Sequence, residues 1–355
     1  MRTTPMIAAV ALLALAAPAG AAFPGANGPF VVSVNTPCTY AGGFDLVRIP
    51  WKGGTPTPLT DVCGPWDEET DDSAASFRQP DAAPDGQSVL ARSSEATSRI
   101  VRVGIDGGAP TEIPLQQKLI DNGVSPTSFA PDGLHFAADS DRHVDGYDRE
   151  GVYEIPLDGS DARVINDPAD CARPRTCTVF QNPRWSPDGK LLAAEGSTPK
   201  YVKGEKGSHR SGIWLLRVSD GRPVRRVGPA NATELDWSPD SRQLVYRTSY
   251  QQREIKGGAS GGNVFVVRRD GTHRRALVHR EDIAETQPTW SPDGKRVAWV
   301  ALEFSAGDVG FSVKASLWSV GVRSGKRKKL QKLPRVYVEE GFYDTPELTW
   351  LTKTS

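Results

Sequence analysis

The sequence lacks an excess of charge of either sign, because its 43 lysine and arginine residues are matched by 43 aspartate and glutamate residues. Proteins that bind nucleic acid or an anionic membrane through their overall charge are strongly basic. We therefore expect no nucleic-acid partner. The basic residues instead form short local clusters, such as Lys326–Lys329.

Long apolar segments are missing beyond the first 22 residues. Residues 1–22 place Arg2 before an apolar run from Met6 to Ala17 and then a stretch of small residues, which is the pattern of a secretory signal peptide. The run is too short to span a bilayer comfortably. The sequence therefore predicts a protein that is secreted or held in the periplasm or cell envelope, with no transmembrane segment after signal removal. An uncleaved N-terminal anchor is the alternative.

Cysteine is scarce, with four residues in the chain. In an exported protein, cysteines favour disulfides. Among the three possible pairings, proximity in the sequence favours Cys38–Cys63 and Cys171–Cys177. Neither pair has the spacing of a zinc knuckle, and no histidine lies near either, so no metal site is predicted there.

A Pro-Asp-Gly turn recurs along the chain at intervals of about 50 residues. Proline fixes φ at the first corner of a type I turn, and glycine accepts the left-handed position that closes the hairpin. Three copies follow a Trp-Ser pair, and we expect these tryptophans to pack between repeats. This interval is typical of one four-stranded blade of a β-propeller. The copies begin at Pro84, Pro131, Pro187, Pro239 and Pro292, with serine replacing glycine in the fourth.

A second set of turns, mostly Asp-Gly, lies between these copies and follows segments rich in β-branched and aromatic residues. A further inner strand is expected at residues 347–350, where Glu-Leu-Thr-Trp resembles the start of a repeat. The first strand, residues 29–33, lacks an inner neighbour of its own. We therefore predict an all-β protein in which residues 23–355 form a six-bladed β-propeller, closed by pairing of the C-terminal strand with the N-terminal blade.

The Trp-Ser-Pro-Asp-Gly repeat resembles the TolB-like (WD-like) propeller repeat of bacterial envelope proteins. The resemblance extends over nearly all of residues 23–355. It implies the propeller fold. It is less informative about activity, since propellers carry ligand binding, scaffolding and several catalytic activities on one frame.

The predicted connections differ in length between the two faces of the ring. The Pro-Asp-Gly and Asp-Gly tips are short, whereas the connections on the opposite face are longer and more varied. Because long loops on a rigid frame usually carry binding residues, we predict that the long-loop face is the functional surface. The sequence predicts no cofactor, although the acidic loops on this face could offer oxygen ligands to calcium. The candidate binding residues are Asp67, Asp71, Asp72, Asp139, Asp141 and Asp145.

No catalytic constellation is visible in the sequence. The Gly-x-Ser-x-Gly match at Gly258–Gly262 precedes a predicted strand, whereas a nucleophile elbow follows one. We predict a monomeric binding or protein-interaction scaffold whose partner is an envelope or extracellular protein or a glycan. The alternative is an enzyme, for example a polysaccharide-cleaving lyase with a metal in the propeller funnel, held by histidines such as His143 and His209.

The cysteine pairing gives a direct test. Each predicted disulfide closes a short loop and should contribute about 2 to 4 kcal/mol by restricting the unfolded chain. Non-reducing peptide mapping of the exported protein should recover Cys38 linked to Cys63 and Cys171 linked to Cys177. Four free thiols, or Cys38 linked to Cys171, would show that the pairing is wrong.

Overall fold

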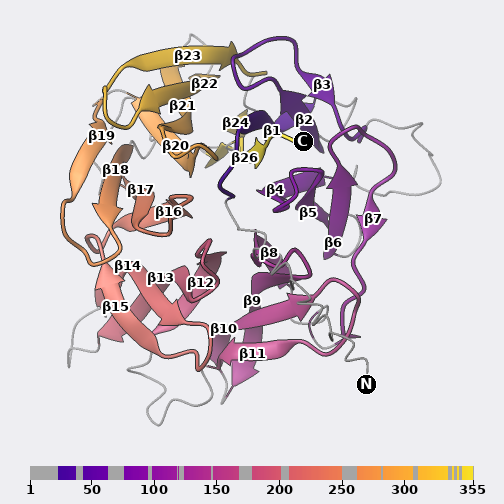
Figure 1. The fold of residues 1–355 in the computed structure, drawn as a ribbon, viewed down its shortest axis with the longest axis vertical. Coiled ribbons are helices and arrows are strands. Elements are labelled where there is room, and N and C mark those ends of the chain that lie inside the picture. Colours follow the sequence, from indigo (N-terminus) through magenta and orange to yellow (C-terminus); the bar gives the residue numbers. More distant parts are fainter. Residues whose placement is uncertain are drawn as a thin grey trace, which may run out of the picture.

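The computed structural model is almost entirely β-strand, and its sheets are arranged around a central axis (Figure 1). Among the described residues, no helix is long and apolar enough to cross a bilayer. The predicted signal peptide and all four cysteines lie outside the described residues, so both remain predictions. The structure describes residues 23–36, 43–62, 76–94, 98–117, 119, 124–144, 147–167, 178–200, 208–249, 262–280, 283–306, 311–334, 338–339, 342–343 and 346–354.

Antiparallel strands follow one another from the axis outward in each sheet (Figure 1). The innermost strands are β26 (Leu348–Thr352), β4 (Ser76–Ala82), β8 (Val124–Phe129), β12 (Val179–Trp185), β16 (Ala232–Trp237) and β20 (Ile283–Trp290). The second strands are β1 (Asn27–Thr36), β5 (Ser88–Ser94), β9 (His135–Val144), β13 (Leu191–Lys200), β17 (Gln243–Ser249) and β21 (Arg296–Ala306). The third strands are β2 (Gly43–Ile49), β6 (Ser98–Gly104), β10 (Tyr147–Pro156), β14 (Ser208–Arg217), β18 (Gly262–Arg268) and β22 (Phe311–Gly321). The outer strands are β3 (Thr57–Pro58), β7 (Thr111–Glu112), β11 (Arg163–Asn166), β15 (Pro223–Val227), β19 (Arg275–Val278) and β23 (Arg327–Lys332).

Strands β16 to β23 are joined into one larger sheet through a single parallel pair, Gly262 with Ala284. Apart from that one pair, β16–β19 and β20–β23 form two separate antiparallel four-stranded sheets like the others. A separate short hairpin consists of β24 (Val338–Glu339) and β25 (Phe342–Tyr343). The all-β propeller arrangement predicted from the repeats is therefore present.

The repeated turn is held by its own side chains. In the third copy, the Ser186 hydroxyl donates to Asp188 Oδ1 at 2.7 Å, and the same oxygen accepts the Lys190 amide at 3.2 Å. The glycine after the aspartate has the expected left-handed backbone, with φ of 69° at Gly189. The Ser-Asp bond recurs in Ser238–Asp240 and Ser291–Asp293, at 2.6 and 2.7 Å.

The repeat tryptophans pack between neighbouring sheets, as predicted. Trp185, Trp237 and Trp290 are buried. Trp237 belongs to the same buried cluster as Ile213 of the preceding sheet, and its indole Nε1 donates to the Arg184 carbonyl there at 3.0 Å. Each such aromatic residue fills the wedge between two sheets and fixes their spacing.

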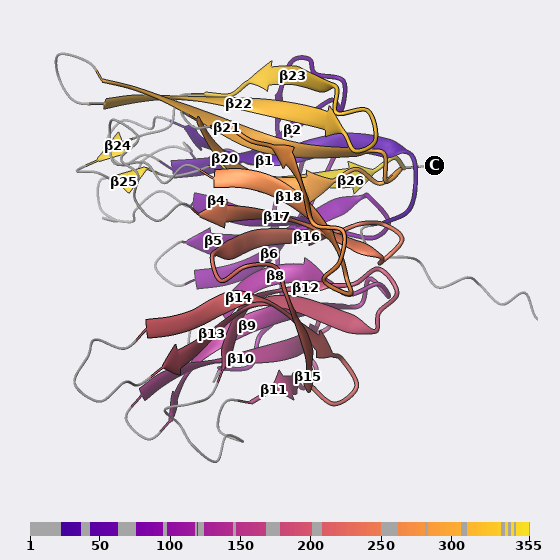
Figure 2. The same cartoon turned by 90° about the vertical axis from the view of Figure 1, so that its left-hand side faces the viewer.

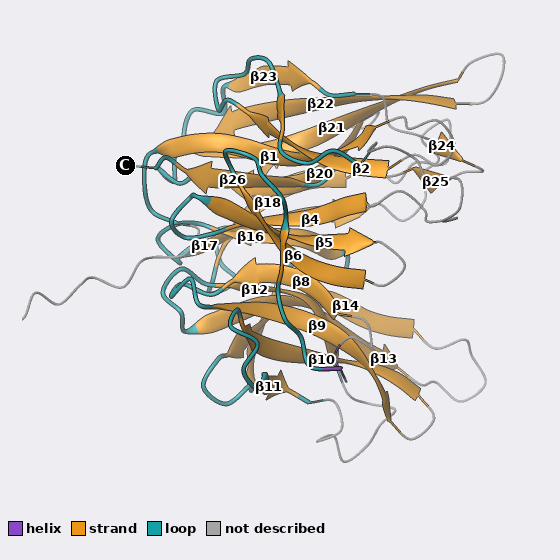
Figure 3. Ribbon diagram, turned by 90° about the vertical axis from the view of Figure 1, so that its right-hand side faces the viewer, coloured by secondary structure: helices purple, strands orange, loops and turns teal. Residues whose placement is uncertain are grey.

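The short turns gather on one face of the propeller, which is the face where the C-terminus lies (Figure 2 and Figure 3). On the other face, the sequence predicts long connections at residues 139–151 and 197–212, but strands extend into both. Strands β9 and β10 stay paired to Val144 and Tyr147, and β13 and β14 stay paired to Lys200 and Ser208. Main-chain pairing does not require apolar side chains, so polar segments such as these can continue a strand.

The C-terminal strand pairs with the N-terminal one, as the sequence predicts. Strand β26 lies antiparallel to β1, with Trp350 opposite Phe30. The two rings lie 4.4 Å apart between centroids, and Trp350 Nε1 donates to the Gly28 carbonyl at 3.1 Å. The ends of the chain are thus joined by backbone pairing and a buried aromatic contact.

Deleting residues 346–355 tests the contribution of this pairing to stability. The deletion removes buried Leu348, Trp350 and Leu351 and leaves β1 without its inner neighbour. We expect the melting temperature to fall by roughly 10 °C or more, because each large buried side chain contributes several kcal/mol. Deleting residues 354–355 alone is the matched control and should change little. A truncated protein that melts within a degree or two of the parent contradicts this expectation.

Candidate functional site

Two of the six aspartates predicted as binding residues lie in the described part of the chain. Asp139 and Asp141 are on strand β9 rather than in a loop. Asp139 Oδ1 accepts the Asn182 amide of the next sheet at 3.3 Å, so this carboxylate joins two sheets beside the central axis. The other four, Asp67, Asp71, Asp72 and Asp145, lie outside the described residues.

Metal binding was the other sequence-based hypothesis. Within the described ranges, no three histidine, cysteine, aspartate or glutamate side chains come together as a group that could hold a metal. His143 lies on β9 and His209 on β14, which belong to neighbouring sheets. The calcium hypothesis concerns acidic residues of which most are undescribed, so it remains a prediction.

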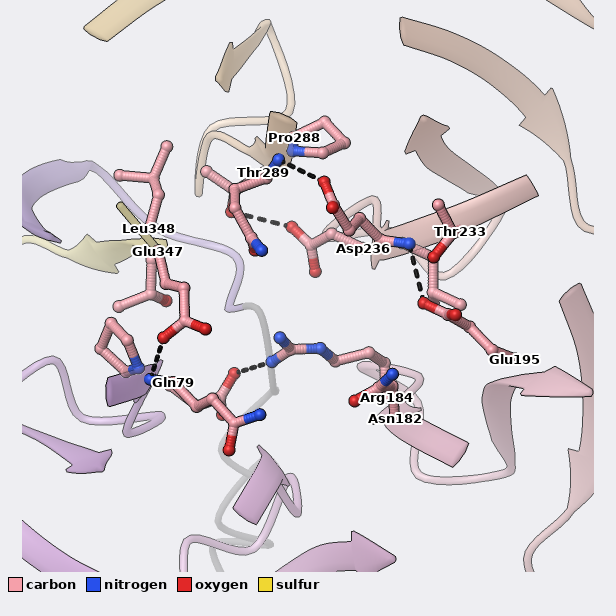
Figure 4. A pocket seen from close by; sticks show the side chains of 16 residues that line it. Gln79, Asn182, Arg184, Glu195, Thr233, Asp236, Pro288, Thr289, Glu347 and Leu348 are labelled. Carbon is pink, nitrogen blue, oxygen red and sulfur yellow. Dashed lines mark hydrogen bonds and ion pairs between the residues drawn. The ribbon is translucent and has the colours of Figure 1, made fainter. Parts of the chain in front are cut away.

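The described residues do form a polar cavity on the propeller axis (Figure 4). Its volume is about 280 Å³, and five innermost strands contribute to its wall. Its charged lining consists of one arginine, Arg184, and five carboxyl groups. These carboxyl groups belong to Asp81, Glu195, Glu234, Asp236 and Glu347.

A bulge in the innermost strands builds the wall of this cavity. The register of β4, β12, β16 and β20 shifts at the same place in each strand, where one residue adopts a positive φ. Such a backbone is uncommon for residues other than glycine and is often found at functional sites. The residues are Gln79, Asn182, Glu234 and Gln287, with φ of 54°, 50°, 48° and 51°.

Each bulged residue gives its amide to a carboxylate from the preceding sheet. The Glu234 amide donates to Glu195 Oε1 at 2.8 Å, and the Gln287 amide donates to Glu234 Oε2 at 2.7 Å. Gln79 donates in the same way to Glu347. A buried amide without a partner is costly, so these carboxylates stabilise the bulges.

A second row of side chains comes from the position that precedes the repeat tryptophan in β12, β16 and β20 and that precedes Ala82 in β4. In this row, Asp236 Oδ2 accepts the Trp290 amide of the next sheet at 2.8 Å and the Thr289 hydroxyl at 3.0 Å. Asp81 Oδ2 accepts the Phe129 amide of its own next sheet at 2.7 Å. The strand geometry therefore points one polar residue per sheet at the axis and links it to its neighbour.

Arg184 occupies the same row and extends into the cavity (Figure 4). Its Nη1 lies 2.6 Å from Asp81 Oδ1. Burial raises the pKa of Asp81 from its ordinary value of 3.8 to about 6. Arg184 and the Phe129 amide oppose this rise, and Asp236 adds to it. Burial thus disfavours the charged form of Asp81 more than the ion pair with Arg184 favours it.

The other axial carboxyl groups show the same effect. Burial raises the pKa of Glu195, Asp236 and Glu347. Arg184 lowers the pKa of Asp236, and Arg78 lowers that of Glu347 more than Arg184 does. Glu234 is paired with Arg247, at 2.5 Å. The cavity therefore holds more carboxyl groups than its cations balance, and a cationic group entering it would favour their charged forms.

Comparisons with known proteins agree with this architecture. No family model matches the chain. Its sequence is 30% identical over 119 residues to peptidase YuxL of Bacillus subtilis, covering 33% of this chain and 16% of that protein. It is 31% identical over 74 residues to dipeptidyl-peptidase 5 of Porphyromonas gingivalis, covering 21% of this chain and 10% of that protein. The chain thus aligns with a small part of each of these curated relatives.

Among solved structures, a TolB from Agrobacterium tumefaciens superimposes with a TM-score of 0.56 at 16% identity, over 88% of this chain and 91% of that one. The fold is that of a TolB-like β-propeller. A chain of a nidogen/laminin complex also superimposes, with a TM-score of 0.51 at 13% identity, over 90% of this chain and 98% of that one. At such identities, the likeness concerns the fold alone.

The axial cavity of this TolB-like propeller was missed by the sequence reasoning, which looked for function in the loops. A signal was present, because the position before the repeat aromatic is polar in several repeats, as in Asp236 before Trp237 and Arg184 before Trp185. Strand alternation places that residue opposite the buried tryptophan and so toward the axis. The bulges have no comparable signal at Gln79, Glu234 and Gln287, since glutamine and glutamate rarely adopt a positive φ, and Asn182 is the one bulged residue of a type enriched there.

The raised pKa of Asp81 predicts how the stability of this TolB-like propeller depends on pH. Between about pH 4 and 6, the folded state keeps a proton on Asp81 that the unfolded chain has lost, so this group's contribution to stability is lost as pH rises through that window. In Asp81→Asn, the carboxamide that replaces the carboxyl group does not ionise between about pH 4 and 6. Wild type should therefore lose about 2 to 3 kcal/mol relative to Asp81→Asn between pH 4 and pH 7.

Urea unfolding at pH 4, 5.5 and 7 measures this difference. Asp85→Asn, which changes an exposed turn carboxylate, is the matched control and should follow wild type. A gap between wild type and Asp81→Asn that is equal at pH 4 and pH 7 would show that Asp81 is not held in its protonated form by burial.

Proposed function

We propose that this protein is an exported six-bladed propeller that acts as a binding module in the cell envelope. The observation that carries the proposal is the axial cavity, which is lined by five carboxyl groups and one arginine. The ligand that fits such a lining is a cationic group on an envelope or extracellular protein, such as a lysine or arginine side chain or an amino terminus. We propose that the protein acts as a monomer and without catalysis.

The six-blade count is supported by the recurrence of one four-strand pattern from β26 to β23, with an innermost strand at the axis each time (Figure 1). The pairing of β26 with β1 supports closure of the ring at the chain termini. Export is supported by the leader pattern of residues 1–22.

Cation binding is supported by the charge balance of the cavity. Burial raises the pKa of Asp81, Glu195, Asp236 and Glu347, so a proton or a ligand cation is favoured beside each of them. The bulges and their inter-sheet hydrogen bonds hold these groups in place before any ligand arrives. Such preorganisation lowers the entropic cost of binding.

The predicted long-loop face fits the same function as the entrance to the cavity. Asp139 lies on β9, where it is paired with Ser125 of β8. Its Oδ1 accepts the amide of Asn182, the bulged residue of the next sheet. We propose that Asp141, Asp145 and the acidic segment with Asp67, Asp71 and Asp72 attract the cationic partner toward the axis.

An enzyme is the second candidate. The relatives that match part of the sequence are peptidases, and this observation favours a catalytic role. A polysaccharide-cleaving lyase that holds a metal with His143 and His209 is another form of the same candidate. Both forms predict turnover of a substrate rather than stable binding.

Capture from an envelope extract, followed by titration with a lysine-rich peptide, tests the proposal. Asp81→Asn/Asp236→Asn should weaken peptide binding about tenfold or more, because each lost charge pair in a partly buried site contributes on the order of 1 kcal/mol or more. Asp158→Asn/Asp220→Asn removes the same charge from exposed outer turns and should bind like wild type. Equal binding by wild type and the axial variant contradicts the proposal. Turnover of a peptide or polysaccharide that is lost in His143→Ala or His209→Ala would establish the enzyme instead.

A further inference from the structure

A second groove lies on the outer side of the propeller, far from the axial cavity, where the turn after β2 meets β23. Its volume is about 200 Å³. One aromatic, one aliphatic, one hydroxyl and three cationic side chains line it. These residues are Trp51, Lys52, Arg296, Ser319, Lys328 and Leu330.

Local geometry brings the two walls of this groove together. Ser319 on β22 is paired with Lys328 on β23, so these residues share a row across the sheet. The opposite wall is the turn at Trp51, which approaches β23 closely because it contains Gly53. At φ 89°, a Cβ on Gly53 would lie 2.3 Å from the Leu330 carbonyl oxygen, and only glycine fits.

The cations of the groove are concentrated around the tryptophan. Lys52 Nζ lies 5.0 Å from the Trp51 ring centroid, and Lys328 Nζ donates to the Lys52 carbonyl at 3.3 Å. Arg296 enters the groove from β21. The side chains of the three cationic residues thus line one small groove that spans the first and last sheets of the chain.

These three cations have no carboxylate partner among the described residues. Other arginines on the outer side do have one, for example Arg217, whose Nη1 lies 2.6 Å from Asp220 Oδ2. Protection of an edge strand against pairing accounts for the exposed charges of β23. It does not account for Arg296, which is half-buried on an inner strand, or for the convergence of the three cations beside an aromatic ring.

We propose that this groove binds one anionic sugar unit of an acidic polysaccharide. A tryptophan offers a flat apolar surface for a sugar ring, and lysine and arginine bind its carboxylate or other acidic group through charge-assisted hydrogen bonds. The groove is smaller than the roughly 300 to 1,000 Å³ of pockets for drug-sized ligands, which limits its occupant to about one ring. Arg327 and Lys329 alternate onto the opposite face of β23, where Lys329 lies over the Trp318 ring, so the charge of the groove comes from Lys52, Arg296 and Lys328.

A polysaccharide fits better than a membrane surface. A bilayer would contact the exposed residues of β23, whereas half-buried Arg296 and Trp51 are reached only by a group that enters the groove. The inference does not depend on the axial cavity, because the two sites share no residue.

Titration of the full mature protein with galacturonate oligomers tests the proposal, with neutral galactose oligomers as the ligand control. Lys52→Gln/Lys328→Gln and, separately, Arg296→Gln should weaken galacturonate binding about tenfold. Trp51→Phe should retain partial binding if the ring face is used. The matched control is Arg222→Gln/Arg225→Gln, which removes two positive charges at the outer strand of another sheet and should bind like wild type. Thermal melting checks that each variant is folded.

Several outcomes would overturn the proposal. Equal losses of galacturonate affinity in the variants Lys52→Gln/Lys328→Gln and Arg222→Gln/Arg225→Gln would mean that the oligomer is attracted by surface charge in general and is not bound at this groove. Equal affinity for galacturonate and neutral galactose oligomers would exclude recognition of the acidic group. Groove-dependent binding to phosphatidylglycerol vesicles or duplex DNA, without groove-dependent binding to galacturonate, would assign the groove to a lipid or nucleic acid.

Discussion

The hydrogen bonds between buried carboxylates and the amides of neighbouring innermost strands are the interaction on which the centre of this propeller depends. A bulged strand near the axis presents an amide that no strand of its own sheet can satisfy. Glu195, Glu234 and Glu347 satisfy such amides across sheet boundaries. Together with apolar packing and the contacts of Asp81, Arg184 and Asp236, these bonds join neighbouring sheets, and they place carboxyl groups where water is scarce.

The same arrangement explains why the axis is a candidate binding site. Burial raises the pKa of the axial carboxyl groups, and the one arginine that lines the cavity, Arg184, cannot balance them all. Groups that stabilise the bulges are therefore also poised to accept a cation. The outer groove has the opposite character, with three cations and no carboxylate among its lining residues. A chain without net charge thus separates its charges in space, and each of the two sites favours a different class of ligand.

The fold could be predicted from sequence because its signals are local and repeated. Serine, proline, aspartate and glycine make the turn by contacts within five residues, as Ser186 and Asp188 show. The pairing of Trp350 with Phe30 could be predicted because one repeat was missing its inner strand. The axial site could not be predicted, since Asp81 and Arg184 are about a hundred residues apart and meet only because their sheets are arranged around one axis. The sequence predicts a long connection over residues 139–151, where β9 and β10 are instead paired to Val144 and Tyr147, because backbone pairing does not depend on side-chain polarity.

The central claim is that carboxyl groups on the axis are buried with raised pKa and available to a cation. Carbon-13 NMR titration of the protein labelled at its aspartate and glutamate carboxyl groups, with Asp81 assigned through Asp81→Asn, measures this directly. The account predicts that the pKa of Asp81 lies near 6 and falls when a lysine-rich peptide is added. A pKa for Asp81 close to the ordinary value of 3.8, unchanged by the peptide, would contradict it.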